Sequence, residues 1–166
     1  MITKETVRER RRRWWKLPLV WIDPVRGYVS AWFLSITFEA APHATSFERS
    51  LILLATATLL FGVLWMQTRG RVHAGETISP SSFLGGMMLA LLPPVVAYAA
   101  IAIGVATAIA MKNFAAGYLV AATTTLAIGY LFLDRSPYLA VYTLLVAAPL
   151  IINWLRRTAL VMPVRC

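Results

Sequence analysis

Four long stretches of this chain lack ionisable side chains. Residues 50–68, 77–111, 113–133 and 136–155 contain no Asp, Glu, Lys, Arg or His. A helix needs about 20 mostly apolar residues to cross the hydrocarbon core of a bilayer, so each stretch is long enough to span it. The sequence therefore predicts an all-α integral membrane protein with four transmembrane helices, and it leaves no room for a separate soluble domain.

Cysteine and histidine are also nearly absent. The single cysteine, Cys166, excludes an internal disulfide and a cysteine cluster that could hold a metal. The two histidines, His43 and His73, fall outside the apolar stretches. The sequence shows no Gly-rich phosphate loop, no paired carboxylates and no zinc-ligand spacing. We therefore predict no catalytic residues, no cofactor and no metal site, and we expect that the chain is not an enzyme.

The charges that are present are unevenly placed along the chain. Of its 16 Lys and Arg residues, 13 lie before residue 50, at Lys112 or after residue 155. The alternation of four spans leaves only Arg69, Arg71 and Arg135 for the other side of the membrane. Basic residues favour the cytoplasmic side. Both termini are therefore expected in the cytoplasm, in a multi-pass protein that we assign to the bacterial inner membrane.

Residues 1–47 form a predicted cytoplasmic arm in which four adjacent arginines are followed directly by two tryptophans. Such a cluster suits the headgroup zone, where guanidinium groups meet anionic lipid and indole rings lie at the water boundary. We expect this arm to bind anionic membrane lipids or a protein partner, and no nucleic acid. The expected lipid- or partner-binding residues are Arg10, Arg11, Arg12, Arg13, Trp14, Trp15 and Trp32.

An amphipathic helix is predicted at the end of this arm. Asp23 and Pro24 fit the N-cap and the first position of a helix. Apolar residues then recur at helical spacing as far as Ile36. The uncharged part, residues 27–38, is too short to cross a bilayer. It predicts a helix that lies in the membrane interface.

The rest of the chain divides into a four-helix bundle, residues 48–157, and a short cytoplasmic tail, residues 158–166. The second span contains Pro93 and Pro94, and proline removes a backbone donor and clashes with the preceding turn. That span is either one kinked helix or a separate piece over residues 82–92 followed by a crossing. The four spans are predicted at about 48–68, 82–111, 114–133 and 137–155.

Small residues recur at every fourth position in the second and third spans. Such stripes let helix backbones approach closely inside a membrane. The packing partner is either another helix of this chain or a second subunit. The predicted helix-packing residues are Ala102, Ala106, Ala110, Gly117, Ala121, Thr125 and Gly129.

Uncharged spans, small-residue stripes and a lipid-binding arm favour an accessory or structural subunit that docks against larger membrane-complex subunits or forms a homo-oligomer. One alternative is a small oligomeric transporter or channel for a small or lipidic molecule, gated at the break before Pro94. Another is an enzyme that acts on lipid headgroups through the loop that follows the first span. Its candidate residues are Arg69, Arg71, His73 and Glu76, which could grip an anionic group.

Overall fold

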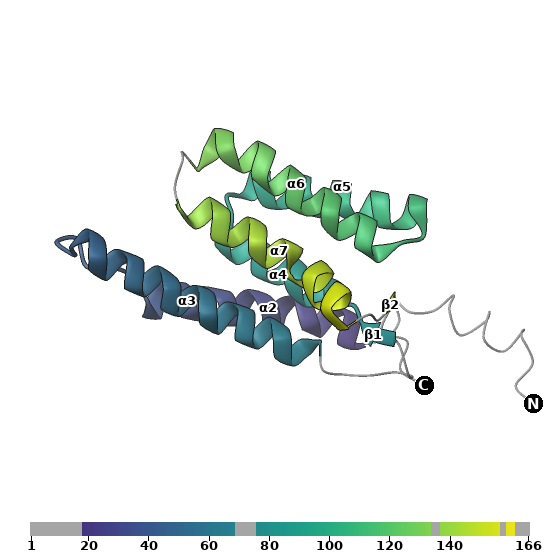
Figure 1. The fold of residues 1–166 in the computed structure, drawn as a ribbon, viewed down its shortest axis with the longest axis horizontal. Helices are drawn as coiled ribbons and strands as arrows, with labels where there is room; N and C mark the ends of the chain where they lie inside the picture. Colours follow the sequence, from purple (N-terminus) through teal and green to yellow (C-terminus); the bar gives the residue numbers. More distant parts are fainter. Residues whose placement is uncertain (1–17, 69–75, 134–136, 157–158, 162–166) are drawn as a thin grey trace, which may run out of the picture.

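The structure, a computed structural model, describes residues 18–68, 76–133, 137–156 and 159–161. These residues are almost entirely helical, which confirms the all-α fold class (Figure 1). Two short strands also pair in parallel. The elements in chain order are α2 (Pro18–Thr37), α3 (Ser46–Gln67), β1 (Glu76–Ile78), α4 (Ser81–Leu91), α5 (Pro94–Met111), α6 (Phe114–Phe132), α7 (Pro137–Arg156) and β2 (Ala159–Val161).

Four of these helices, α3, α5, α6 and α7, are long and apolar enough to cross a membrane, with mean hydropathy between 1.5 and 2.0. They confirm the predicted multi-pass membrane protein. In the most apolar 18-residue segment of each of these helices, between 11% and 33% of the residues are buried inside the protein. Lipid or another protein must therefore cover most of their surface.

The segment predicted as a second span is two helices. α4 ends at Leu91, Leu92 is extended with φ −105° and ψ 151°, and Pro93 caps α5 at its N-terminus. Proline suits the first turn of a helix, where its missing N–H would have no partner, but it cannot continue a helix. The two prolines therefore end one helix and begin the next.

The C-terminal ends of α3 and α7 lie together. Nη1 of Arg156, the last residue of α7, donates a hydrogen bond of 3.0 Å to the backbone carbonyl oxygen of Thr68, which caps α3. β1, which precedes α4, pairs with β2, which follows α7. α4 therefore begins at the end of the bundle where α3 and α7 finish, which we call the Arg156 end (Figure 1).

α4 then carries the chain to the opposite end. Lys112, in the left-handed conformation (φ 50°), and Asn113 join α5 to α6 in a tight antiparallel link. α6 and α7 also run in opposite directions (Figure 1). α7 finishes at the Arg156 end, so α6, which runs the other way, begins there. α5 is antiparallel to α6 and therefore begins at the opposite end, which the chain reaches through α4.

This path differs from the predicted topology, which put the ends of the first and last spans on opposite sides of the membrane. The prediction counted residues 82–111 as one passage, whereas α4 and α5 make two. α4 has 11 residues and is about 16 Å long, far less than a bilayer core. Other helices cover it, since Phe83, Leu84, Met87 and Met88 are buried.

The N-terminal helix is longer than the sequence predicts. α2 begins at Pro18, so Pro24 lies inside it, and Asp23 forms an ion pair with Arg26 instead of capping the helix start. Close packing of α2 on α4 supports the helix around the proline. α2 starts at the Arg156 end (Figure 1). It runs from there to the end where α3 begins, so it lies along the bundle beside α4, which differs from the predicted placement in the plane of the membrane interface.

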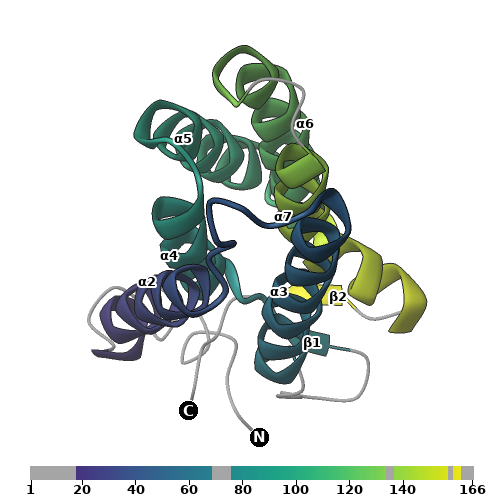
Figure 2. The ribbon, with the colours of Figure 1, turned by 90° about the vertical axis from the view of Figure 1, so that its left-hand side faces the viewer.

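The six helices of the described residues form three layers of two. α5 and α6 make one outer layer, α4 and α7 the middle layer, and α2 and α3 the other outer layer (Figures 1 and 2). The middle layer lies at the centre of the hydrophobic core, to which the helices of both outer layers also contribute. The most deeply buried large side chains are Leu60, Leu64, Leu84, Met87, Val96, Leu145 and Val146.

Candidate functional surfaces

The predicted small-residue stripe of the third span lies where α6 meets both of its neighbours. A Cβ atom added to Gly117 would lie 2.8 Å from the carbonyl oxygen of Gly104 on α5. A Cβ atom on Gly129 would overlap the side chain of Leu139 on α7. The stripe therefore serves packing within this chain. All four of its members are buried: Gly117, Ala121, Thr125 and Gly129.

The predicted stripe of α5 lies elsewhere. Ala102, Ala106 and Ala110 are exposed, and α5 meets α6 through Gly104 and Ala108 instead. α5 is so rich in alanine that stripes offset by two residues look alike in the sequence. Gly104 was the distinguishing signal, because a glycine allows the closest approach of two helix backbones.

The sequence interpretation missed the contact between α2 and α4. A Cβ atom on Gly27 would overlap the carbonyl oxygen of Phe83, and one on Gly86 would overlap the carbonyl oxygen of Pro24. The two backbones therefore touch at their glycines. A sequence signal was present, since Gly27 and Gly86 are each followed four residues later by alanine.

The outward face of α2 is covered with large apolar side chains. Trp32, predicted to bind lipid or a partner, is half exposed on it. Its neighbours on this face are Trp21, Ile22, Val25, Tyr28, Val29, Phe33 and Ile36. The other predicted residues of the arm, Arg10, Arg11, Arg12, Arg13, Trp14 and Trp15, lie outside the described residues.

α3 contacts the rest of the chain through one half only. Its buried residues are Ala57, Leu60 and Leu64, all towards the Arg156 end. In its other half, Phe47 is 71% exposed and Leu54 is 64% exposed. The N-terminal half of α3 therefore offers an apolar surface that no described part of this chain covers.

Arg156 holds the covered half of α3 to α7. Besides the hydrogen bond to the carbonyl oxygen of Thr68, its guanidinium carbon lies 4.4 Å from the centre of the Trp65 ring. This geometry is a cation–π contact. Also at this end, the hydroxyl groups of Ser79 and Tyr118 form a buried hydrogen bond of 2.7 Å. The Arg156 end is thus fastened by polar contacts between segments distant in sequence.

We expect Arg156→Gln to lower the free energy of unfolding by about 2 kcal/mol, because it removes a charge-assisted hydrogen bond and a cation–π contact. Denaturation in mild detergent would measure this change. Arg49→Gln is the matched control, since Arg49 bonds the carbonyl oxygen of Pro42 at an exposed site and should change stability by less than about 0.5 kcal/mol. Equal effects of the two substitutions would show that Arg156 does not hold α3.

The loop proposed for lipid-headgroup chemistry falls mostly outside the described residues: Arg69, Arg71 and His73 do so, and Glu76 begins β1. No three His, Cys, Asp or Glu side chains gather into a possible metal site within the part of the chain that the structure describes. No protein-family model, curated protein or solved structure matches this chain.

Proposed function

We propose that this chain is an accessory or structural subunit of a larger membrane protein complex, and that the outward face of α5 packs against a helix of a partner. The observation that carries the proposal is the exposure of Ala102, Ala106 and Ala110. These alanines lie at the spacing that lets helix backbones approach closely in a membrane, while α5 meets α6 through another face. Alanine also offers less apolar surface to lipid than leucine or isoleucine would.

Two further surfaces support a docking role. The N-terminal half of α3 and the outward face of α2 expose large apolar side chains that no described residue covers. Aromatic residues such as Trp32 contribute strongly to protein–protein interfaces and also suit the bilayer boundary. In this proposal the basic arm anchors the subunit to anionic lipid beside its partner.

We further propose that the Arg156 end faces the cytoplasm of a bacterial inner membrane. α2 begins at this end, and α3, α5 and α7 finish there. Of the 16 Lys and Arg residues, 13 adjoin it in the sequence and Arg26 lies within α2, whereas Arg49 and Arg135 adjoin the opposite end. The positive-inside rule supports this orientation.

The test is co-purification from the source membrane after gentle extraction, read by native mass spectrometry. The wild-type chain should carry stoichiometric amounts of a larger subunit. Ala106→Leu should lose it, because the larger side chain holds the helices apart, while the stability of the isolated chain changes by less than about 0.5 kcal/mol.

Val105→Leu is the matched control, because Val105 is also exposed on α5 but lies beside the alanine stripe. It should keep the partner. A wild-type chain that elutes as a bare monomer, or an Ala106→Leu variant that keeps the same partner, would contradict the proposal.

A further inference from the structure

We propose that Asp23 and Arg26 on α2 form a binding site for a phospholipid whose headgroup carries both a phosphate and a primary ammonium. Arg26 would bind the phosphate and Asp23 the ammonium. The proposal does not depend on the docking function, since it needs a lipid and no protein partner.

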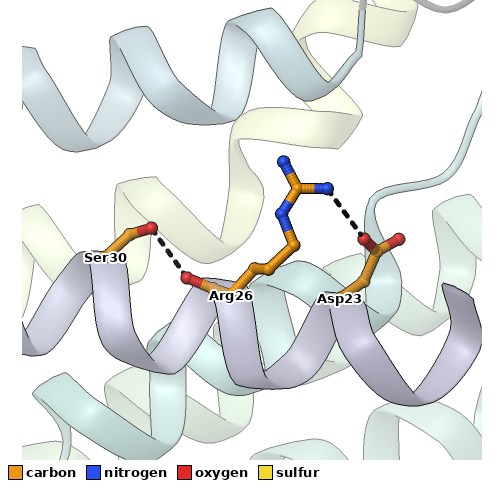
Figure 3. Close-up of polar contacts among 3 residues, drawn as sticks. All are labelled: Asp23, Arg26 and Ser30. Carbon is orange, nitrogen blue, oxygen red and sulfur yellow. Dashed lines mark hydrogen bonds and ion pairs between the residues drawn. The ribbon is translucent and has the colours of Figure 1, made fainter.

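The site begins with an ion pair on an apolar helix. Nη1 of Arg26 lies 3.5 Å from Oδ1 of Asp23 (Figure 3), and this is the one ion pair found among the described residues. The Arg26 side chain is 57% exposed and that of Asp23 is 23% exposed. Both charges can therefore be reached by a molecule outside the protein.

Arg26 keeps most of its hydrogen-bonding capacity for a ligand. A guanidinium has five N–H donors in a planar fork, and the contact with Asp23 uses one of them at a long distance. The hydroxyl of Ser30 donates to the backbone carbonyl oxygen of Arg26 at 2.7 Å, so it does not occupy the guanidinium (Figure 3). A phosphate could thus accept two parallel hydrogen bonds from this side chain.

The surroundings of the pair are those of a lipid site. An open groove of about 460 Å³ runs past Arg26, lined by Trp21, Ile22, Val25, Arg26, Val29 and Ser30. Its walls are mostly apolar, with one exposed cation among them. Acyl and glycerol carbons can lie on the apolar walls while the phosphate meets the guanidinium.

The direction of the Arg26 side chain sets the depth of the site. It leans back along α2 towards Asp23 and the N-terminus of the helix (Figure 3). That direction leads to the Arg156 end, where α2 begins. Long basic side chains in membranes turn in this way to bring the charge to the headgroups. The ligand therefore comes from the phosphate layer of the membrane leaflet at the Arg156 end.

The paired charges select the kind of headgroup. The carboxylate of Asp23 accepts hydrogen bonds, which a primary ammonium can donate and a quaternary choline cannot. A headgroup that carries only negative charge would be repelled by the carboxylate of Asp23. A zwitterionic ethanolamine headgroup complements both members of the pair.

The experiment is native mass spectrometry of the purified chain in detergent, titrated with phosphatidylethanolamine, phosphatidylcholine or phosphatidylglycerol. The wild-type chain should bind the ethanolamine lipid most tightly. Arg26→Gln should weaken that binding about tenfold, the effect of losing one charge-assisted pair. Asp23→Asn should abolish the preference for ethanolamine over choline while phosphate binding persists.

Lys112→Gln is the matched control, because Lys112 is an exposed cation at the same end of the bundle but outside the groove. It should leave ethanolamine lipid binding unchanged. The proposal is overturned if Arg26→Gln binds this lipid as tightly as the wild type, if Lys112→Gln loses equal affinity, or if the ethanolamine preference survives in Asp23→Asn. Should Arg26→Gln fail to fold, the headgroup preference of Asp23→Asn decides alone.

Discussion

Replacing Gly86 by alanine is expected to push α2 away from α4 and to lower the free energy of unfolding by about 3 kcal/mol, the upper range for overpacking a well-packed core. The added methyl group would overlap the backbone carbonyl group of Pro24. Backbone atoms cannot turn aside as a flexible side chain can, so the whole helix has to move. Denaturation in mild detergent, followed by circular dichroism, would measure the loss.

The neighbouring glycine provides the control. A Cβ atom on Gly85 would lie 4.0 Å from Cδ1 of Ile101, which is an ordinary contact. Gly85→Ala should therefore raise stability by up to about 1 kcal/mol through the higher helix propensity of alanine. Gly62→Ala should behave in the same way, since nothing lies within 4 Å of that position. If Gly86→Ala were as stable as these two variants, α2 and α4 would not meet at their glycines.

Single cysteines placed at positions 43 and 113 are expected to react from opposite sides of the membrane. α3 begins just after His43 and runs to the Arg156 end, where the link between α5 and α6 also lies. Both variants are made in a Cys166→Ser background. A membrane-impermeant maleimide should label His43→Cys only in vesicles of one orientation and Asn113→Cys only in vesicles of the other. The expected contrast is nearly complete, because the proposed orientation puts a bilayer between the two positions.

The sequence prediction gives the contrary result, since it places residue 43 and residue 113 together in the cytoplasm. Labelling of both cysteines from the same side would support the sequence-predicted topology. It would also contradict the inference that α4 carries the chain from one side of the membrane to the other. The loss of the Asn113 side-chain cap, which accepts a hydrogen bond from the backbone N–H of Ala115, costs only about 1 kcal/mol and does not alter the result.

Helix positions followed from the sequence because charge, proline and turn residues mark their ends. The span predicted at 114–133 is α6, Phe114–Phe132, and the proline pair marks the boundary before α5. The passage made by α4 did not follow, because hydropathy identifies a crossing by its length and α4 has 11 residues. Its neighbours make that passage possible, and neighbours are not visible in a local window.

Packing faces were only partly predictable for a related reason. Every fourth residue of α6 points to a neighbour because α6 lies between α5 and α7, so its small-residue stripe was recognisable. α5 has only one close partner among the spanning helices, and its alanine content allows several stripes. The contact of Gly27 with α4 joins segments more than 50 residues apart, and neither glycine alone indicates the other.

The contact between α2 and α4 also sets an order of assembly during synthesis. A nascent chain that ends before Ser81 holds α2 and α3 but lacks the surface on which Gly27 packs. The hairpin of α5 and α6, joined by two residues, can form as soon as it leaves the ribosome. α2 therefore waits while α3 and the segment after it are made, and until α4 arrives its glycine face remains open to chaperones, lipids or a partner subunit.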